Sequence, residues 1–128
     1  MSFKREERLK GRTRIREVFS KGKRYYWQVK VSEKEQTLNQ GARLFVLQNN
    51  LPYNRICFSF TKAASRNFGD AAARNRARRL GREAFRLIKG RLCAGHDFIL
   101  LILPESKMTL SGRMEQMETL FKKAGLLK

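Results

Sequence analysis

Apolar residues recur along this chain with two different periods, and the period changes from one segment to the next. Apolar positions three and four residues apart predict amphipathic helices, because those positions share one side of a helix. Alternating apolar and polar positions predict strands. The predicted helices cover residues 13–20, 71–89 and 109–124, and the predicted strands cover residues 25–31, 43–48, 55–61 and 97–103.

Capping and turn residues set the predicted ends of these elements. Thr13 and Asp70 are expected to cap the first two helices at their N-termini, and Gly125 is expected to end the last one. The first three strands follow one another through connections at 32–41 and 49–54, which predicts an antiparallel meander.

The fourth predicted strand has a different pattern. Its apolar run from Phe98 to Leu103 is unbroken, so both faces are expected to be buried, in a central or covered position of the sheet.

The helix predicted at 71–89 combines an apolar stripe with a high density of arginine. The stripe is expected to pack on the sheet and consists of Ala73, Ala77, Leu80, Ala84, Leu87 and Ile88. Between Ala71 and Arg91 there are eight basic residues and one acid, Glu83. Like charges at helical spacing repel, so this surface calls for an external polyanion. The alternative is a solvated basic face with no ligand.

Overall composition favours the same kind of partner. The 128 residues include 29 Lys and Arg against 11 Asp and Glu, for a formal charge of +18, and the sequence pI is about 11.0. Nucleic acid is the expected partner of so basic a chain. An apolar content of 41% suffices for a compact core.

The length predicts a single domain over 1–128, with a mobile basic arm at about 1–12. No apolar run approaches the roughly 20 residues of a membrane span, and no secretion signal opens the chain. The expected location is the cytoplasm.

Residues that could carry chemistry are few. Cys57 and Cys93 have apolar neighbours and are expected to be free, buried thiols. His96, the only histidine, is expected at a turn or surface, because no motif supplies a serine, cysteine or carboxylate partner. We therefore expect no catalytic residues and no metal site in the protein alone.

Two further sets of residues bear on nucleic-acid binding. Asn75 lies between two arginines, where its amide could bind a phosphate, a base edge or a hydrated metal ion, or could merely be tolerated near a helix start. Most aromatic residues are expected in the core, but one sheet face could expose rings beside cations as a platform for single-stranded nucleotides. The candidates are Phe19 and the strand that contains Phe58 and Phe60 and leads to Lys62.

Several segments together resemble the bacterial ribonuclease P protein subunit. The segment ARNRARRLGREAFR at 73–86 resembles its RNR signature, and EVFSKG at 17–22, RICFSFTK at 55–62 and AGHDFILLILP at 94–104 resemble its other motifs in the same order. The likeness covers about nine-tenths of the chain.

The resemblance implies an α/β two-layer sandwich with the element order αβββαβα. Its four-stranded, mainly antiparallel sheet would have a left-handed βαβ crossover around the arginine-rich helix. In that family an RNA is the catalyst that removes the 5′ leader of precursor tRNA, with Mg²⁺ bound mainly by the RNA. The protein would bind both RNAs, as a monomer in a 1:1 complex with the catalytic RNA.

The resemblance also implies roles for individual residues. Those matched to the motif that contacts the catalytic RNA are Arg74, Asn75, Arg76, Arg78, Arg79 and Arg82. Phe19 and Lys62 match residues of the leader-binding cleft, and Ile15 stands where the family often has a second cleft phenylalanine. With Phe58 and Phe60, these residues make up the predicted leader cleft.

Two other functions are considered, one that uses the same basic helix and one that needs a different site. A ribosomal protein or general RNA chaperone would bind RNA without a role in cleavage. A protein-only nuclease would need a cluster of carboxylates, and Asp70, Glu83 and Asp97 are scattered in the sequence.

Overall fold

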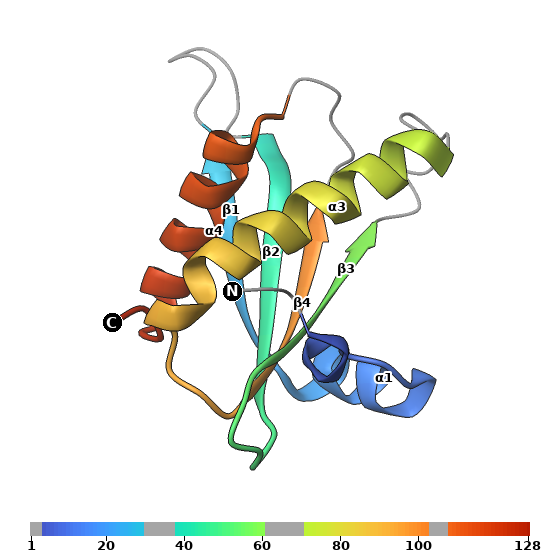
Figure 1. Cartoon of the computed structure of the whole chain (residues 1–128), viewed down its shortest axis with the longest axis vertical. Coiled ribbons are helices and arrows are strands. Elements are labelled where there is room, and N and C mark those ends of the chain that lie inside the picture. The colour runs from blue at the N-terminus through green and yellow to red at the C-terminus, as the bar shows by residue number, and fades with distance from the viewer. Residues whose placement is uncertain (1–3, 30–37, 61–70, 103–107) are drawn as a thin grey trace.

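The protein is described here by a computed structural model, which covers residues 4–29, 38–60, 71–102 and 108–128 (Figure 1). Within these residues, four strands form one sheet, three α-helices pack on it, and two short 3₁₀ turns flank them. The elements in chain order are η1 (Arg5–Glu7), α1 (Arg12–Lys21), β1 (Lys23–Val29), β2 (Leu38–Gln48), β3 (Arg55–Phe60), α3 (Ala71–Ile88), η2 (Lys89–Arg91), β4 (His96–Ile102) and α4 (Leu110–Lys123).

The strands do not follow their chain order in the sheet. The spatial order is β1-β2-β4-β3, with β1 and β4 antiparallel to β2 and with β3 parallel to β4. The central position predicted for the last strand is therefore confirmed. The predicted three-stranded meander is wrong, because β4 lies between β2 and β3.

The connection from β3 to β4 runs through α3 and is left-handed. In Figure 1 both strands point upward and α3 lies on the viewer's side of the sheet, while the chain passes from β3 on the right to β4 on its left. Most such crossovers are right-handed, so the handedness implied by the resemblance is a specific feature that this chain shares.

One face of the sheet and the helices α3 and α4 enclose the larger core. Alternate residues of β3 and β4 point into it, among them Ile56, Phe58, Phe98 and Leu100. The alternation in the sequence of β3 thus correctly predicts that Ile56 and Phe58 share a face. Phe98 meets Phe121 of α4 edge to face, with ring centroids 4.9 Å apart.

The buried stripe of α3 differs from the predicted one. Its buried residues are Ala77, Gly81, Ala84, Phe85 and Ile88. Leu87, predicted in the stripe, is 44% exposed, whereas Gly81 faces the sheet. A Cβ atom at Gly81 would lie 2.5 Å from the ring of Phe58, so the absent side chain lets α3 approach β3 closely.

The opposite face of the sheet carries a smaller core under α1. Its buried members are Leu9, Val18, Phe45 and Ile99. Helix α1 begins after Gly11, whose φ of +96° favours glycine, and no side chain caps it. The Thr13 cap is therefore wrong, and Thr13 lies inside the helix.

Residues 4–10, predicted as part of a mobile arm, are docked on the fold. Leu9 is 4% exposed and donates its N–H to the carbonyl of Ile56 in β3. Glu7 is also buried and pairs with Lys89 Nζ at 2.7 Å. The sequence pattern missed this because the segment has one buried apolar residue, and its other contacts are a backbone hydrogen bond and an ion pair to residues distant in sequence.

The remaining element ends are mixed in outcome. Thr109 caps α4 by accepting from the N–H of Gly112. Gly125 follows that helix with a positive φ, which agrees with its predicted place at the helix end. Strand β2 begins at Leu38, so part of the predicted 32–41 loop is strand. The predicted cap Asp70 lies outside the described residues.

Candidate nucleic-acid interface

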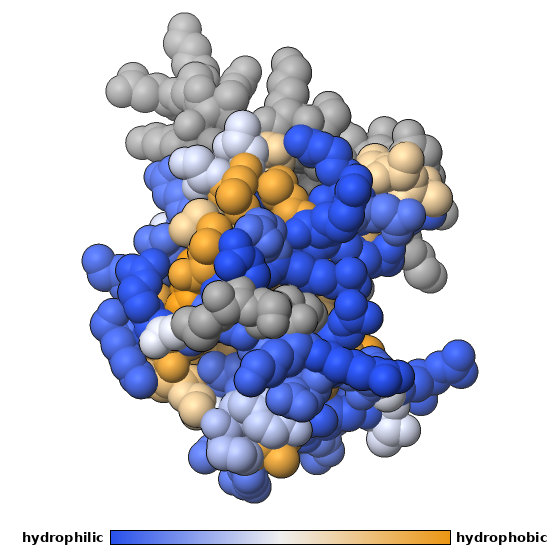
Figure 2. Space-filling model, in the orientation of Figure 1, coloured by the Kyte–Doolittle hydropathy of each residue, from blue (hydrophilic) through white to orange (hydrophobic). Residues whose placement is uncertain are grey.

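The arginines of α3 lie on the side of the helix turned away from the α3–α4 core. Arg74, Arg78 and Arg82 are four residues apart and half-buried along the β3 side, while Asn75, Arg76 and Arg79 are exposed. Hydrophilic residues cover most of this face in Figure 2. The predicted RNA-binding residues therefore lie on one helix, as a half-buried row and an exposed set beside it.

Arg78 is held in place by two neighbours. Its guanidinium carbon lies 5.0 Å from the ring centroid of Phe60, and its Nη1 donates to Asn75 Oδ1 at 3.3 Å. A cation over an aromatic face is attracted by the ring quadrupole. Asn75 thus contacts an arginine of the motif, a role not considered for it from sequence.

Arg82 lies in a hollow between α3, β3 and the N-terminal segment. Burial lowers the pKa of its guanidinium, and the nearby Arg8 and Arg78 lower it further. Arg8, Lys10, Arg78 and Arg82 line this hollow, and none of them forms an ion pair with a carboxylate in the described part of the chain. Their mutual repulsion would be relieved by an anion. Arg8 and Lys10 were missed as site residues because the arm was expected to be mobile.

Two other α3 arginines have partners within the protein. Arg76 Nη2 donates to the carbonyl of Met108 at 3.1 Å. Arg86 pairs with Glu83, the only acid of the helix. The single negative charge of α3 therefore pairs with Arg86 in the C-terminal half of the helix, and it does not neutralise the row of Arg74, Arg78 and Arg82.

The predicted leader cleft is divided by the sheet. Ile15 and Phe19 pack in the smaller core on the α1 face, whereas Phe58 and Phe60 belong to the α3–α4 face. Phe58 is only 9% exposed. The four described residues therefore do not line one cleft, and the fifth, Lys62, lies outside the described residues.

The α1 face has aromatic and cationic side chains that the sequence reading did not single out. In the β1–β2 register Arg24 lies opposite Phe45, and Tyr26 lies opposite Arg43. The two guanidinium carbons lie 5.4 Å and 5.5 Å from the ring centroids of Phe45 and Tyr26. We call the set Phe19, Arg24, Tyr26, Arg43 and Phe45 the aromatic–cation surface.

Phe19 and Phe45 form the base of this surface. Their ring centroids are 4.8 Å apart in an edge-to-face arrangement, and Arg24 Nη2 donates to the Phe19 carbonyl at 3.3 Å. Phe45 is buried beneath, while Tyr26 and Arg43 are exposed. Exposed rings beside cations suit stacking of single-stranded bases. Alternation within β1 and within β2 shows which residues of each strand share a face. Which residues of the two strands lie opposite each other depends on the strand register, which the sequence does not give.

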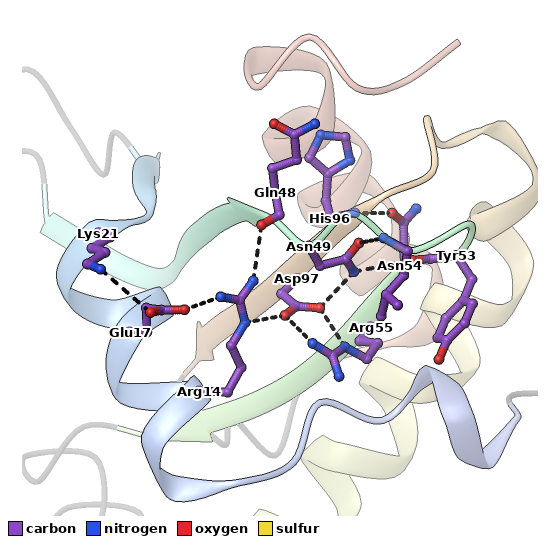
Figure 3. A network of polar contacts seen from close by, with 11 residues as sticks. Arg14, Glu17, Lys21, Gln48, Asn49, Tyr53, Asn54, Arg55, His96 and Asp97 are labelled. Carbon is purple, nitrogen blue, oxygen red and sulfur yellow. Dashed lines mark hydrogen bonds and ion pairs between the residues drawn. The ribbon is translucent and has the colours of Figure 1, made fainter.

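A buried carboxylate, Asp97 of β4, lies where α1 meets the ends of β2 and β3 (Figure 3). Burial alone would disfavour its charge. Hydrogen bonds from Arg55, Asn49 and Arg14 outweigh that cost and hold the pKa of Asp97 below its ordinary value. Asp97 was considered from sequence only as a scattered acid, because its partners lie 42 to 83 residues away.

Other groups with potential chemistry do not cluster. The two cysteines are free and half-buried, and burial, with a smaller effect of Asp97, raises the pKa of Cys57 to about 12. Within the described ranges, no three His, Cys, Asp or Glu side chains come together as a metal site. No helix in the same ranges is long and apolar enough to cross a bilayer.

Comparison with known proteins identifies the family of this chain. The family profile described as Ribonuclease P matches residues 3–125. A ribonuclease P protein component from Alkaliphilus metalliredigens is 34% identical over 64 residues, which are 50% of this chain and 54% of that protein. Against this relative the match spans about half the length.

Longer matches extend over most of the chain. A ribonuclease P protein component from Clostridioides difficile is 31% identical over 108 residues, covering 84% of this chain and 81% of that protein. The solved RNase P protein of Staphylococcus aureus has the same fold, with a TM-score of 0.68 at 22% identity, over 95% of this chain and 98% of that one. The chain therefore belongs to the ribonuclease P protein family.

Proposed function

We propose that this chain is the protein subunit of a ribonuclease P, binding the catalytic RNA with α3 and the 5′ leader of precursor tRNA on the opposite sheet face. In this proposal the RNA carries the chemistry and binds most of the Mg²⁺. The protein acts in the cytoplasm as one copy per RNA.

The observation that carries the proposal is the arginine row of α3. Arg74, Arg78 and Arg82 recur at each helical turn, so they can follow a polynucleotide backbone. Guanidinium groups bind phosphate oxygens through paired hydrogen bonds and stack on bases. An exposed set of three more motif residues widens the contact. Affinity for the catalytic RNA is therefore expected to fall steeply with salt.

The leader is assigned to the α1 face because of the aromatic–cation surface there. Tyr26 and Phe19 offer ring faces or edges, and Arg24 and Arg43 supply charge beside them. A leader is single-stranded, and single strands are bound by stacking together with cations. With Phe58 and Phe60 on the other face, Ile15 and Phe19 remain the proposed leader contacts among the described residues, and Lys62 stays a prediction.

Reconstitution tests the proposal. The protein is mixed with a bacterial ribonuclease P RNA at low Mg²⁺, and cleavage of precursor tRNA is measured. We expect faster cleavage than with the RNA alone, because the protein adds binding energy for the substrate. No change, with an RNA that is active at high Mg²⁺, would contradict the proposal.

Two controls separate the competing functions. Co-sedimentation with ribosomes and equal affinity for mature and leader-bearing tRNA would indicate a ribosomal protein or RNA chaperone. Cleavage by the protein without RNA would indicate a protein-only nuclease.

A further inference from the structure

Among the described carboxylates, only Asp97 is completely removed from solvent, and the proposed RNA contacts do not use it. Its Oδ1 accepts from Arg55 Nε at 2.7 Å and from Asn49 Nδ2 at 2.9 Å. Its Oδ2 accepts from Arg55 Nη2 at 2.6 Å and from Arg14 Nε at 2.7 Å. Both oxygens are thus fully occupied.

Arg14 is in excess of what Asp97 needs. Arg55 already supplies one full positive charge through a bidentate contact, and Asn49 adds another donor. Arg14 comes from a different element, α1, and its own charge is balanced by Glu17 on the same helix. The charge of Asp97 is already compensated by Arg55, so the main effect of the Arg14 contact is to join α1 to the sheet (Figure 3).

The other attachments of helix α1 to the sheet are mainly apolar. Val18 is its only buried residue, Ile15 and Phe19 pack beside it, and the C-terminal end continues through Gly22 directly into β1. Arg14 adds polar contacts near the N-terminal end of the helix, because it bonds Asp97 and also donates Nη2 to the Gln48 carbonyl at 3.1 Å. Without Arg14, the helix would keep its apolar contacts and its covalent link to β1, but would lose the directional contacts that fix its orientation.

The orientation of α1 matters because Phe19 lies on it. The edge-to-face contact of Phe19 with Phe45 fixes one border of the aromatic–cation surface. We propose that Asp97 and Arg14 are positioning residues that fix the orientation of α1 and thereby shape the surface that receives the leader. This inference rests on the proposed function, since it takes that surface as the leader site.

The test compares two variants that remove the same charge from the same helix. Arg14→Gln removes the contact with Asp97 but leaves Asp97 bonded to Arg55 and Asn49, so the fold is expected to survive. Arg16→Gln is the matched control, because Arg16 is exposed on α1. Arg14→Lys is the conservative variant, which can place one ammonium near Asp97.

Three quantities are measured for each variant. They are affinity of the reconstituted complex for leader-bearing over leaderless precursor tRNA, affinity for the catalytic RNA, and amide hydrogen exchange in α1 and α3. For Arg14→Gln we expect the leader preference to fall about three- to tenfold, with faster exchange in α1 only and unchanged affinity for the catalytic RNA. Arg16→Gln should leave α1 exchange unchanged, and Arg14→Lys should recover part of the leader preference.

The outcomes separate this inference from the function beneath it. A parent protein with no leader preference would overturn the leader surface and this inference together. A parent preference that survives Arg14→Gln, or α1 exchange that does not change, would overturn the positioning role alone. Equal losses of leader preference in Arg14→Gln and Arg16→Gln would show that the lost positive charge causes the effect. That result would also overturn the positioning role.

Discussion

The two faces of the sheet present cations in different ways. On one face the cations come from a helix that covers the sheet, since Arg74, Arg78 and Arg82 of α3 lie along its β3 side. On the other face Arg24 and Arg43 come from the strands themselves, each opposite an aromatic ring. One surface follows the repeat of a helix, and the other follows the register of two strands.

This difference predicts different physical behaviour. A row of arginines on a helix binds a charged backbone with little demand on exact geometry, so its affinity should depend mainly on salt. A surface of rings and cations depends on the spacing of the strands and on the orientation of α1. Its affinity should therefore respond to packing changes that leave net charge untouched.

The largest expected effect is a loss of folding stability, which would disrupt both faces of the sheet together. Phe85→Ala removes a fully buried ring from the α3–α4 core and should destabilise the protein by about 3–5 kcal/mol. Urea denaturation measures the loss. Leu87→Ala is the control on the same helix and should change stability by less than about 0.5 kcal/mol, since Leu87 is exposed. If the α1 face kept its amide protection in Phe85→Ala, the two faces would be independent.

A substitution on the α1 face should affect one ligand only. Phe19→Ala should weaken binding of leader-bearing precursor by about 1–3 kcal/mol, the usual value of one stacked base, and should spare the catalytic RNA. Affinities measured with long-leader and leaderless substrates give the difference. Tyr53→Ala removes an exposed ring outside this surface and serves as the control. Equal losses of affinity for the long-leader and leaderless substrates would contradict a leader-specific role for the α1 face.

The reverse selectivity is expected on α3. Arg78→Ala should weaken binding of the catalytic RNA by about 1–2 kcal/mol, a magnitude suited to hydrogen bonds with charged groups. It should also reduce the slope of log affinity against log salt by about 0.9 for a duplex contact. Arg86→Ala is the matched control, because Arg86 already pairs with Glu83. An unchanged affinity and slope would favour a solvated basic face.

The smallest effect concerns acid stability. Because hydrogen bonds hold the pKa of Asp97 below its ordinary value, the unfolded chain binds more protons than the folded one just below about pH 4. This contribution is present at neutral pH and is lost as pH falls through the folded pKa, by at most about 1.4 kcal/mol per pH unit. Asp97→Asn should flatten the acid side of a plot of unfolding free energy against pH. A slope equal to that of the parent would contradict the ionised state of Asp97.

Local patterns predicted the elements better than their arrangement. Alternation correctly assigned Ile56 and Phe58 to one side of β3, and the unbroken apolar run correctly placed β4 inside the sheet. Alternation does not say which side a helix will cover, so Phe58 and Phe60 were grouped wrongly with Phe19. The fold class came from the resemblance, since spacing does not encode a left-handed crossover.

The candidate site divides in the same way. The arginines of α3 could be predicted because helical spacing is a local property. The pairing of Tyr26 with Arg43 depends on strand register, and the partners of Asp97 depend on tertiary contacts across 42 to 83 residues. Such contacts leave no local signal in a single sequence.

The insertion of β4 between β2 and β3 has a consequence for folding. Strands β2 and β3 are not neighbours in the sheet, so the paired strands β1 and β2 are joined to β3 only when residues 96–102 are in place. The same strand supplies Phe98 to one core and Ile99 to the other. Pairing at such sequence separation is slow, because a long loop must close before any contact stabilises it. We therefore expect both proposed RNA-binding surfaces to form in a single late, cooperative step.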